Sequence, residues 1–169
     1  MAKLLLSLHV LAAIVFIGPV TVAVSLFPRH ARLALGGDDP GAVSVVRLLY
    51  RISRVYSVLG ISVPVLGIAV GARLGVLGDA WLVVSIALTL AAAVLLALAV
   101  LPSQQRAVDL LDRAAAGVTP FRTSDSTGDA AARWAAGAGR LSMSSGLFAL
   151  LWAVVVVLMV VRPGSTTGV

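Results

Sequence analysis

Residues 4–27 read LLLSLHVLAAIVFIGPVTVAVSLF, and this stretch decides the fold. It contains no charged residue, and a helix needs roughly 20 apolar residues to cross a bilayer. It is also longer than the apolar core of a signal peptide, which runs to about 15 residues, so we expect it to be a membrane span. His9 is its one ionisable residue. Pro19 is expected to interrupt the backbone hydrogen bonds, and Pro28 is expected to close the helix.

The composition of the whole chain is typical of a membrane protein. Hydrophobic residues make up 60% of the 169 residues and charged residues 12%, whereas a soluble domain is about half apolar. Cysteine is absent, which excludes disulfides and thiolate metal sites. The net charge of +6 comes from basic residues that flank the apolar runs, so we attribute it to membrane topology and not to nucleic-acid binding.

Three further apolar runs predict three more spans in a single domain of residues 1–169. Amphipathic helical extensions are expected before the second span, after the third and before the fourth. The predicted fold class is therefore all-α, a four-helix transmembrane bundle with cytoplasmic helical extensions. The spans are expected at residues 4–27, 55–74, 80–101 and 141–161, and the cytoplasmic loops at residues 28–54 and 102–140.

The distribution of basic residues predicts the orientation. Of the 13 Lys and Arg residues, ten lie in the segments after the first and third spans, and the other three are Lys3, Arg73 and Arg162. Because positive charge stays in the cytoplasm, both termini are expected to face outward across a bacterial plasma membrane.

Several aspartates are placed to begin helices or to form ion pairs. Asp39, Asp79 and Asp129 each precede a predicted helix and can accept hydrogen bonds from its first free amides. Asp109 and Arg113 are spaced for an i, i+4 ion pair on one helix face.

Small residues on the second and third spans predict close helix packing. Glycine at four-residue spacing lets two helix backbones approach closely in lipid. The predicted packing is between helices of one chain, and the alternative is an interface between two copies of the chain. Pro64 is expected to kink the second span, with Ser62 or Ser57 satisfying the freed backbone groups. The glycine ridge comprises Gly60, Gly67, Gly71 and Gly75, and its expected partner is the stripe of Ser85, Thr89, Ala93 and Ala97.

His9 is the candidate for chemistry within the membrane, because an ionisable residue in a span is a functional hypothesis by default. It could be an axial ligand to haem or a porphyrin, a proton relay or a hydrogen-bond donor to a quinone. The alternative is a neutral imidazole bonded to Ser7, to a serine of a neighbouring helix or to a backbone carbonyl. His30 cannot join it within one chain, because about 31 Å of helix separates the two residues.

Arg47, Arg51 and Arg54 are expected to share one face of the extension before the second span. This face could bind the phosphates of anionic lipids at the cytoplasmic surface or dock a partner protein. The alternative is that these residues only set topology while their side chains snorkel to the headgroups.

The first span with its exit, SLHVLAAIVFIGPVTVAVSLFPRH, resembles the opening helix of a superfamily of small four-span bacterial membrane proteins. The stretch GDAWLVVSIALTLAAAVLLALAVLPSQQRA resembles one branch, the predicted integral membrane proteins known as domain of unknown function 2269. The superfamily includes copper-resistance membrane domains and four-helix membrane protoporphyrinogen oxidases. The resemblance to the oxidases implies a functional histidine at His9. Those oxidases also use a lysine in a later helix, and Lys3 is the only lysine of this chain.

The leading hypothesis is a membrane protein without catalytic chemistry or a cofactor, acting as an accessory or scaffold subunit of a larger membrane complex. Its expected partners are the bilayer, with its anionic lipids, and another membrane protein or a second copy of the chain. The other hypothesis is a haem- or porphyrin-binding membrane protein that uses His9.

Overall fold

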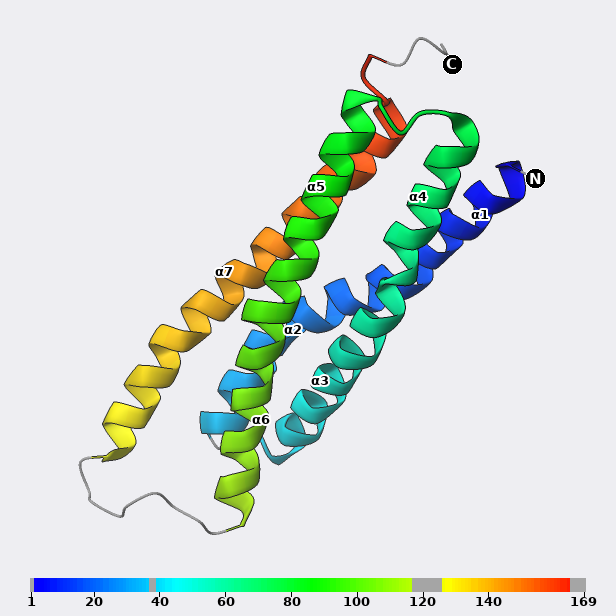
Figure 1. Ribbon diagram of the computed structural model, residues 1–169. Coiled ribbons are helices and arrows are strands. Elements are labelled where there is room, and N and C mark those ends of the chain that lie inside the picture. Colours follow the sequence, from blue (N-terminus) through cyan, green and yellow to red (C-terminus); the bar gives the residue numbers. More distant parts are fainter. Residues whose placement is uncertain (1, 37–38, 117–125, 165–169) are drawn as a thin grey trace.

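Long helices make up the structure, a computed structural model that describes residues 2–36, 39–116 and 126–164, with the backbone alone for Pro40 and residues 126–138 (Figure 1). The described residues contain no strand, which confirms the all-α class. Four helices are long and apolar enough to cross a membrane, as expected of a multi-pass membrane protein. They are Ala2–Gly36, Gly41–Leu74, Ala80–Ala115 and Gly139–Val161.

Three of these helices are divided where the backbone hydrogen bonding changes. The segments are α1 (Ala2–Ala12), η1 (Ala13–Ile17) and α2 (Gly18–Gly36) in the first helix, and α3 (Pro40–Gly60) and α4 (Ser62–Leu74) in the second. The third contains α5 (Ala80–Leu95), η2 (Leu96–Val100) and α6 (Leu101–Ala115), and the fourth is α7 (Ser126–Val161).

Each division lies just before a proline. The π-helical segments η1 and η2 end two residues before Pro19 and Pro102, and the break between α3 and α4 falls at Ile61, three residues before Pro64. A proline has no N–H to donate to the preceding turn, and local π adjustment is one way to satisfy the freed groups. The interruption of backbone hydrogen bonds expected from Pro19 is confirmed by η1, and near Pro64 the helix is broken at Ile61.

The prediction that Pro28 closes the first helix is wrong. The helix continues through Pro28 to Gly36, and Phe27 and Ala31 on either side of the proline are fully buried. They belong to the core where α2 packs on α3. Tertiary packing of an apolar face therefore overrides the local preference of a proline to end a helix.

The helix starts follow the predicted caps in part. The side chain of Asp39 accepts a hydrogen bond from Gly41 N at 2.8 Å, and Pro40 follows at the first helical position, as expected. Asp79 stands at the start of α5, but its side chain makes no capping hydrogen bond. The last helix begins at Ser126, before the predicted start at Asp129.

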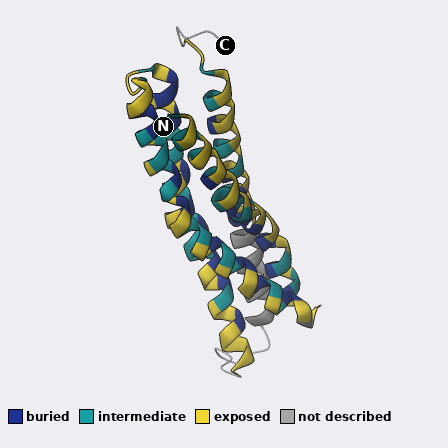
Figure 2. Cartoon of the chain, turned by 90° about the vertical axis from the view of Figure 1, so that its right-hand side faces the viewer, coloured by how far each residue is buried: buried dark blue, intermediate teal, exposed yellow. Residues whose placement is uncertain are grey.

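The packing of the helices changes along the bundle (Figure 1). Towards the chain termini α1 packs on α4 and α5 packs on α7, with few contacts between the two pairs. Towards the opposite end, α2, α3, α6 and α7 enclose the main core together with the end of α5 and η2. Figure 2 shows buried segments in dark blue along the length of the bundle. The largest buried side chains of this core are Phe27 and Phe148.

All four long helices are longer than the membrane is thick, since α7 also contains 36 residues. The first, second and third helices contain 35, 34 and 36 residues, which corresponds to about 50 Å at 1.5 Å per residue. The hydrocarbon core of a bilayer is about 30 Å thick. The surplus forms helical extensions, and we call the end of the bundle that carries Arg29, Arg32, Arg47 and Arg106 the arginine-rich end.

Candidate functional site

His9 lies on α1 and is half-buried against α4. Its Nδ1 is 3.0 Å from the carbonyl oxygen of Val63, a hydrogen bond in which Nδ1–H donates. Of the partners considered from sequence, the backbone carbonyl is the one observed, because the Ser7 hydroxyl donates to Lys3 O at 3.0 Å. This bond orients the imidazole and leaves Nε2 as the ring nitrogen with a lone pair.

Gly67 makes room for this imidazole. A Cβ added at Gly67 would lie 3.0 Å from His9 Cε1 and 3.5 Å from Nδ1, closer than carbon atoms pack at van der Waals contact. The absence of a side chain at Gly67 therefore lets the ring reach the backbone of α4.

The glycine ridge packs on the first helix and not on the predicted stripe of the third. A Cβ at Gly60 would lie 3.2 Å from Ile17 Cδ1, and Gly67 faces His9. Gly71 does approach α5, at Leu82, where a Cβ would lie 2.9 Å from Cδ2. Gly75 has a φ of 71°, the left-handed conformation in which it ends α4, and a Cβ added there would meet no atom within 4 Å.

Ser85 and Thr89 lie on α5, the helix that packs mainly on α7. Ser85 is buried and its hydroxyl donates to Trp81 O at 2.8 Å, while Thr89 Oγ1 donates to Ser85 O at 2.8 Å. Both hydroxyls are thus satisfied within their own helix. Ala93 and Ala97, the rest of the predicted stripe, are exposed.

The three arginines of α3 differ in their contacts. Arg47 Nη2 donates to Oδ1 of Asp112 at 2.6 Å and so joins α3 to α6. Arg51 and Arg54 are exposed. The ion pair predicted between Asp109 and Arg113 is not formed among the described residues, and the carboxylate of α6 that pairs with an arginine is Asp112.

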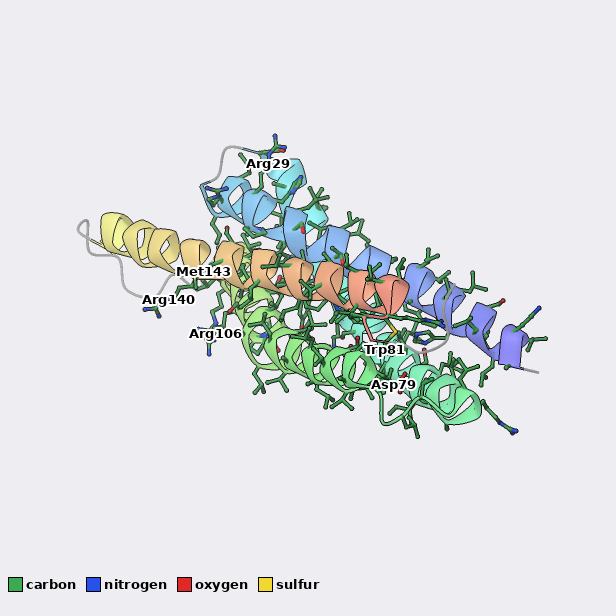
Figure 3. All side chains as sticks on the ribbon, turned by 90° about the horizontal axis from the view of Figure 1, so that it is seen from above. Arg29, Asp79, Trp81, Arg106, Arg140 and Met143 are labelled. Atoms are coloured by element: carbon green, nitrogen blue, oxygen red, sulfur yellow. The ribbon has the colours of Figure 1, made fainter. Side chains whose placement is uncertain are left out.

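A second polar contact closes the terminal end of the bundle and was not foreseen from the sequence. Trp81 Nε1 donates to Asp79 Oδ2 at 3.0 Å, and the Arg162 guanidinium carbon lies 5.6 Å from the centroid of the Trp81 ring. Figure 3 shows Asp79 and Trp81 together near the C-terminal end of α7. This cation–π contact joins α5 to the residue that follows α7.

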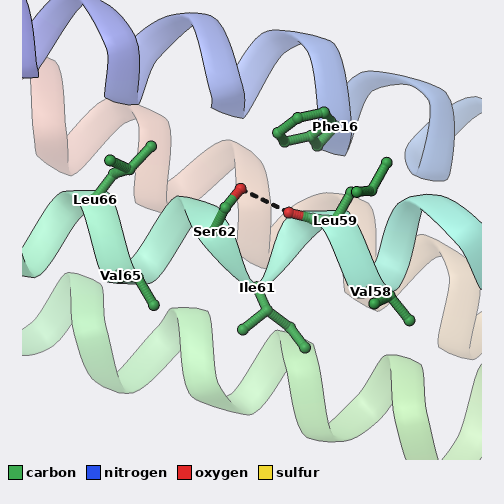
Figure 4. Close-up of a pocket in the computed structure, with 7 residues that line it drawn as sticks. All are labelled: Phe16, Val58, Leu59, Ile61, Ser62, Val65 and Leu66. Atoms are coloured by element: carbon green, nitrogen blue, oxygen red, sulfur yellow. Dashed lines mark hydrogen bonds between the residues drawn. The ribbon is translucent and has the colours of Figure 1, made fainter.

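Described residues line an apolar groove and a polar groove at the surface. An apolar groove of about 530 Å³ lies beside the break between α3 and α4 and is lined by Phe16, Val58, Leu59, Ile61, Ser62, Val65 and Leu66. In Figure 4, Leu59 and Ser62 point towards Phe16, and the Ser62 hydroxyl donates to Leu59 O at 2.6 Å. The carbonyl that Pro64 leaves without a donor is that of Gly60, four residues earlier. Ser62 donates to Leu59 O and Ser57 donates to Arg54 O at 2.9 Å, so neither serine takes the role expected of it.

The other groove is polar and lies between α2 and α7 at the arginine-rich end. Its volume is about 280 Å³, and it is lined by Ser25, Pro28, Arg29, Arg32, Ser142, Ser145 and Gly146. Sequence reasoning missed it because the first helix was expected to end at Pro28. The three-residue spacing of Arg29 and Arg32 would have placed them on one helix face, but only in a helix that continues beyond Pro28.

The core also contains buried polar side chains. Gln104 on α6 and Ser53 on α3 are fully buried. Among the described residues, Gln104 Nε2, Gln104 Oε1 and Ser53 Oγ have no hydrogen-bond partner. Such groups cost free energy when they are left unsatisfied. No sequence pattern distinguished Gln104 from its exposed neighbour Gln105.

Across residues 2–36, 39–116 and 126–164, no group of three or more His, Cys, Asp or Glu side chains is placed to hold a metal ion. The chain matches no protein-family model, no curated protein and no solved structure.

Proposed function

We propose that the chain is an accessory or scaffold subunit that packs against a larger complex in a bacterial plasma membrane, with both termini outside the cytoplasm. The apolar groove beside the break between α3 and α4 is the observation that supports this function. Its occupant would be a transmembrane helix of the partner protein.

The shape of this surface favours a helix. In lipid, covering an apolar surface yields no hydrophobic gain, so helices associate through close packing. The groove offers such packing because Phe16 overhangs one side of it (Figure 4). Val58, Ile61 and Val65 expose 65%, 62% and 61% of their surface, so the protein itself leaves them uncovered.

Filling the groove tests this function. We expect the wild-type protein to co-purify with one membrane protein at a fixed stoichiometry, and we expect Val65→Trp or Ile61→Trp to lose that protein. Val84→Trp on α5, at an exposed position outside the groove, is the matched control and should retain it. A partner that remains bound to both groove variants would contradict the proposal.

A second candidate is a haem- or porphyrin-binding protein, and the geometry of His9 favours it. The bond from Nδ1 to Val63 O is the arrangement that orients an imidazole for coordination through Nε2. The ring is half-exposed, so a porphyrin could approach it from the lipid. When bound, the porphyrin iron would supply redox chemistry, and His9 would hold it.

A visible spectrum separates the two candidates. A Soret band in the purified protein that disappears in His9→Ala but not in His30→Ala would support the porphyrin function. A colourless protein with a stoichiometric membrane partner would support the accessory function.

A further inference from the structure

The polar groove between α2 and α7 differs from the rest of the surface in its chemistry. Two guanidinium groups and three hydroxyl groups line its volume of about 280 Å³. None of the lining residues, all of which belong to the described part of the chain, carries a carboxylate. The groove is therefore suited to an anion.

One wall of the groove is the end of α2. Arg29 and Arg32 stand three residues apart, so they are neighbours on the helix surface. Arg32 Nε donates to Pro28 O at 3.3 Å, which holds its guanidinium along α2. This bond uses Nε and not the two Nη atoms, and neither arginine forms an ion pair with a described carboxylate.

The opposite wall on α7 consists of small residues. Ser142 and Gly146 are exposed, and a Cβ added at Gly146 would meet no atom within 4 Å. Ser145 is buried and donates its hydroxyl proton to Leu141 O at 2.7 Å. The wall therefore leaves the groove open and offers a hydroxyl at Ser142 near the arginines.

The groove also lies at a particular depth. Ser25 is close to the end of the uncharged stretch of residues 4–27, and Arg29 and Arg32 follow directly after it. A groove that begins within an apolar span and ends among arginines lies where hydrocarbon meets headgroups.

We infer that this groove binds the phosphate group of an anionic phospholipid. A guanidinium fork matches the spacing of phosphate oxygens and can form two parallel hydrogen bonds. Arg29 and Arg32 bind the phosphate, the Ser25 and Ser142 hydroxyls contact the polar headgroup, and the acyl chains lie against the apolar part of α2. Basic pockets between helices at this depth are a known mode of lipid recognition.

Native mass spectrometry of the purified full chain in detergent micelles tests the assignment. The micelles contain phosphatidylglycerol, phosphatidylcholine or neither, and retained lipid is counted in each case. We expect preferential retention of phosphatidylglycerol. Each of Arg29→Ala and Arg32→Ala should weaken it about fivefold, since one basic residue contributes about 1 kcal/mol to binding an anionic lipid.

A matched pair of variants controls for overall charge. Figure 3 shows Arg106 and Arg140 on the other side of α7 from Arg29, so Arg106→Ala with Arg140→Ala removes two charges and leaves the groove intact. Equal loss of lipid in that control and in Arg29→Ala with Arg32→Ala would overturn the proposal.

Two further arms test the shape of the groove and the source of the phosphate. Gly146→Leu keeps every charge but fills the groove, and it should reduce phosphatidylglycerol retention as much as the loss of one arginine. Unchanged retention in Gly146→Leu would overturn the proposal. Inorganic phosphate at the concentration of the lipid should not displace it, and displacement would overturn the lipid as the source of the bound phosphate.

Discussion

The imidazole of His9 on α1 is hydrogen-bonded to the carbonyl oxygen of Val63 on α4, with Nδ1 and the oxygen 3.0 Å apart. The bond joins the first two long helices in the terminal half of the bundle, where α1 packs mainly on α4 and α5 packs mainly on α7. Interactions between α1 and α4 are therefore expected to contribute to the stability of this half of the bundle.

Gly67→Ala should destabilise the protein. The added Cβ would lie 3.0 Å from His9 Cε1, so the ring must move away from Val63 or α1 must shift. Overpacking of this kind typically costs about 1–3 kcal/mol. The free energy of unfolding in mixed micelles, measured by titration with SDS, should fall by an amount in that range.

Gly18→Ala is the control for Gly67→Ala. Gly18 lies in the first long helix, as His9 does, but a Cβ there would meet nothing within 4 Å. The free energy of unfolding should therefore not fall in Gly18→Ala. When His9 is first replaced by alanine, Gly67→Ala should lose most of its effect. An undiminished effect in that background would show that the imidazole is not the group that Gly67 accommodates.

Breaking the ion pair between Arg47 and Asp112 should cost little. The side chains expose 49% and 54% of their surface, and exposed pairs contribute about 0.2–1 kcal/mol to stability. A double-mutant cycle with Arg47→Ala and Asp112→Ala, followed by thermal unfolding in detergent, should give a coupling energy in this range that decreases with added salt. Arg51→Ala, in the same cycle with Asp112→Ala, should show no coupling.

The features of the fold that depend on local sequence could be predicted. The four spans follow from apolar runs whose length matches the bilayer, and the cap at Asp39 follows from a short acceptor side chain before Pro40. The changes in backbone hydrogen bonding before Pro19 and Pro64 follow from the missing N–H of proline. Each of these needs only the residues within one turn or one span.

The features that depend on which helices pack together could not be predicted. All faces of a span are apolar, so no pattern indicated that Gly60 and Gly67 face the first helix and not the Ser85 stripe. The continuation of α2 beyond Pro28 depends on its contact with α3. Because the polar groove requires Arg29 and Arg32 on that continuation, it too could not be found from the sequence.

Reporter fusions should place the arginine-rich end in the cytoplasm. A fusion near Asp39 and a fusion at Thr123 should both give the cytoplasmic signal, because ten of the 13 basic residues lie in the segments after the first and third spans. A fusion at Leu77, in the turn between α4 and α5, should give the opposite signal. A cytoplasmic signal at Leu77 would contradict the proposed orientation.

Gln104→Leu should stabilise the protein. Gln104 is fully buried, and neither its Nε2 nor its Oε1 has a hydrogen-bond partner in the part of the chain that the structure describes. An unsatisfied buried polar group costs about 1–3 kcal/mol, and leucine of similar size removes that cost without leaving a large cavity. The midpoint of unfolding in mixed micelles should therefore rise. Gln105→Leu, at the exposed neighbouring position, should leave the midpoint unchanged, and a fall in the midpoint with Gln104→Leu would mean that the amide is hydrogen-bonded in the folded protein.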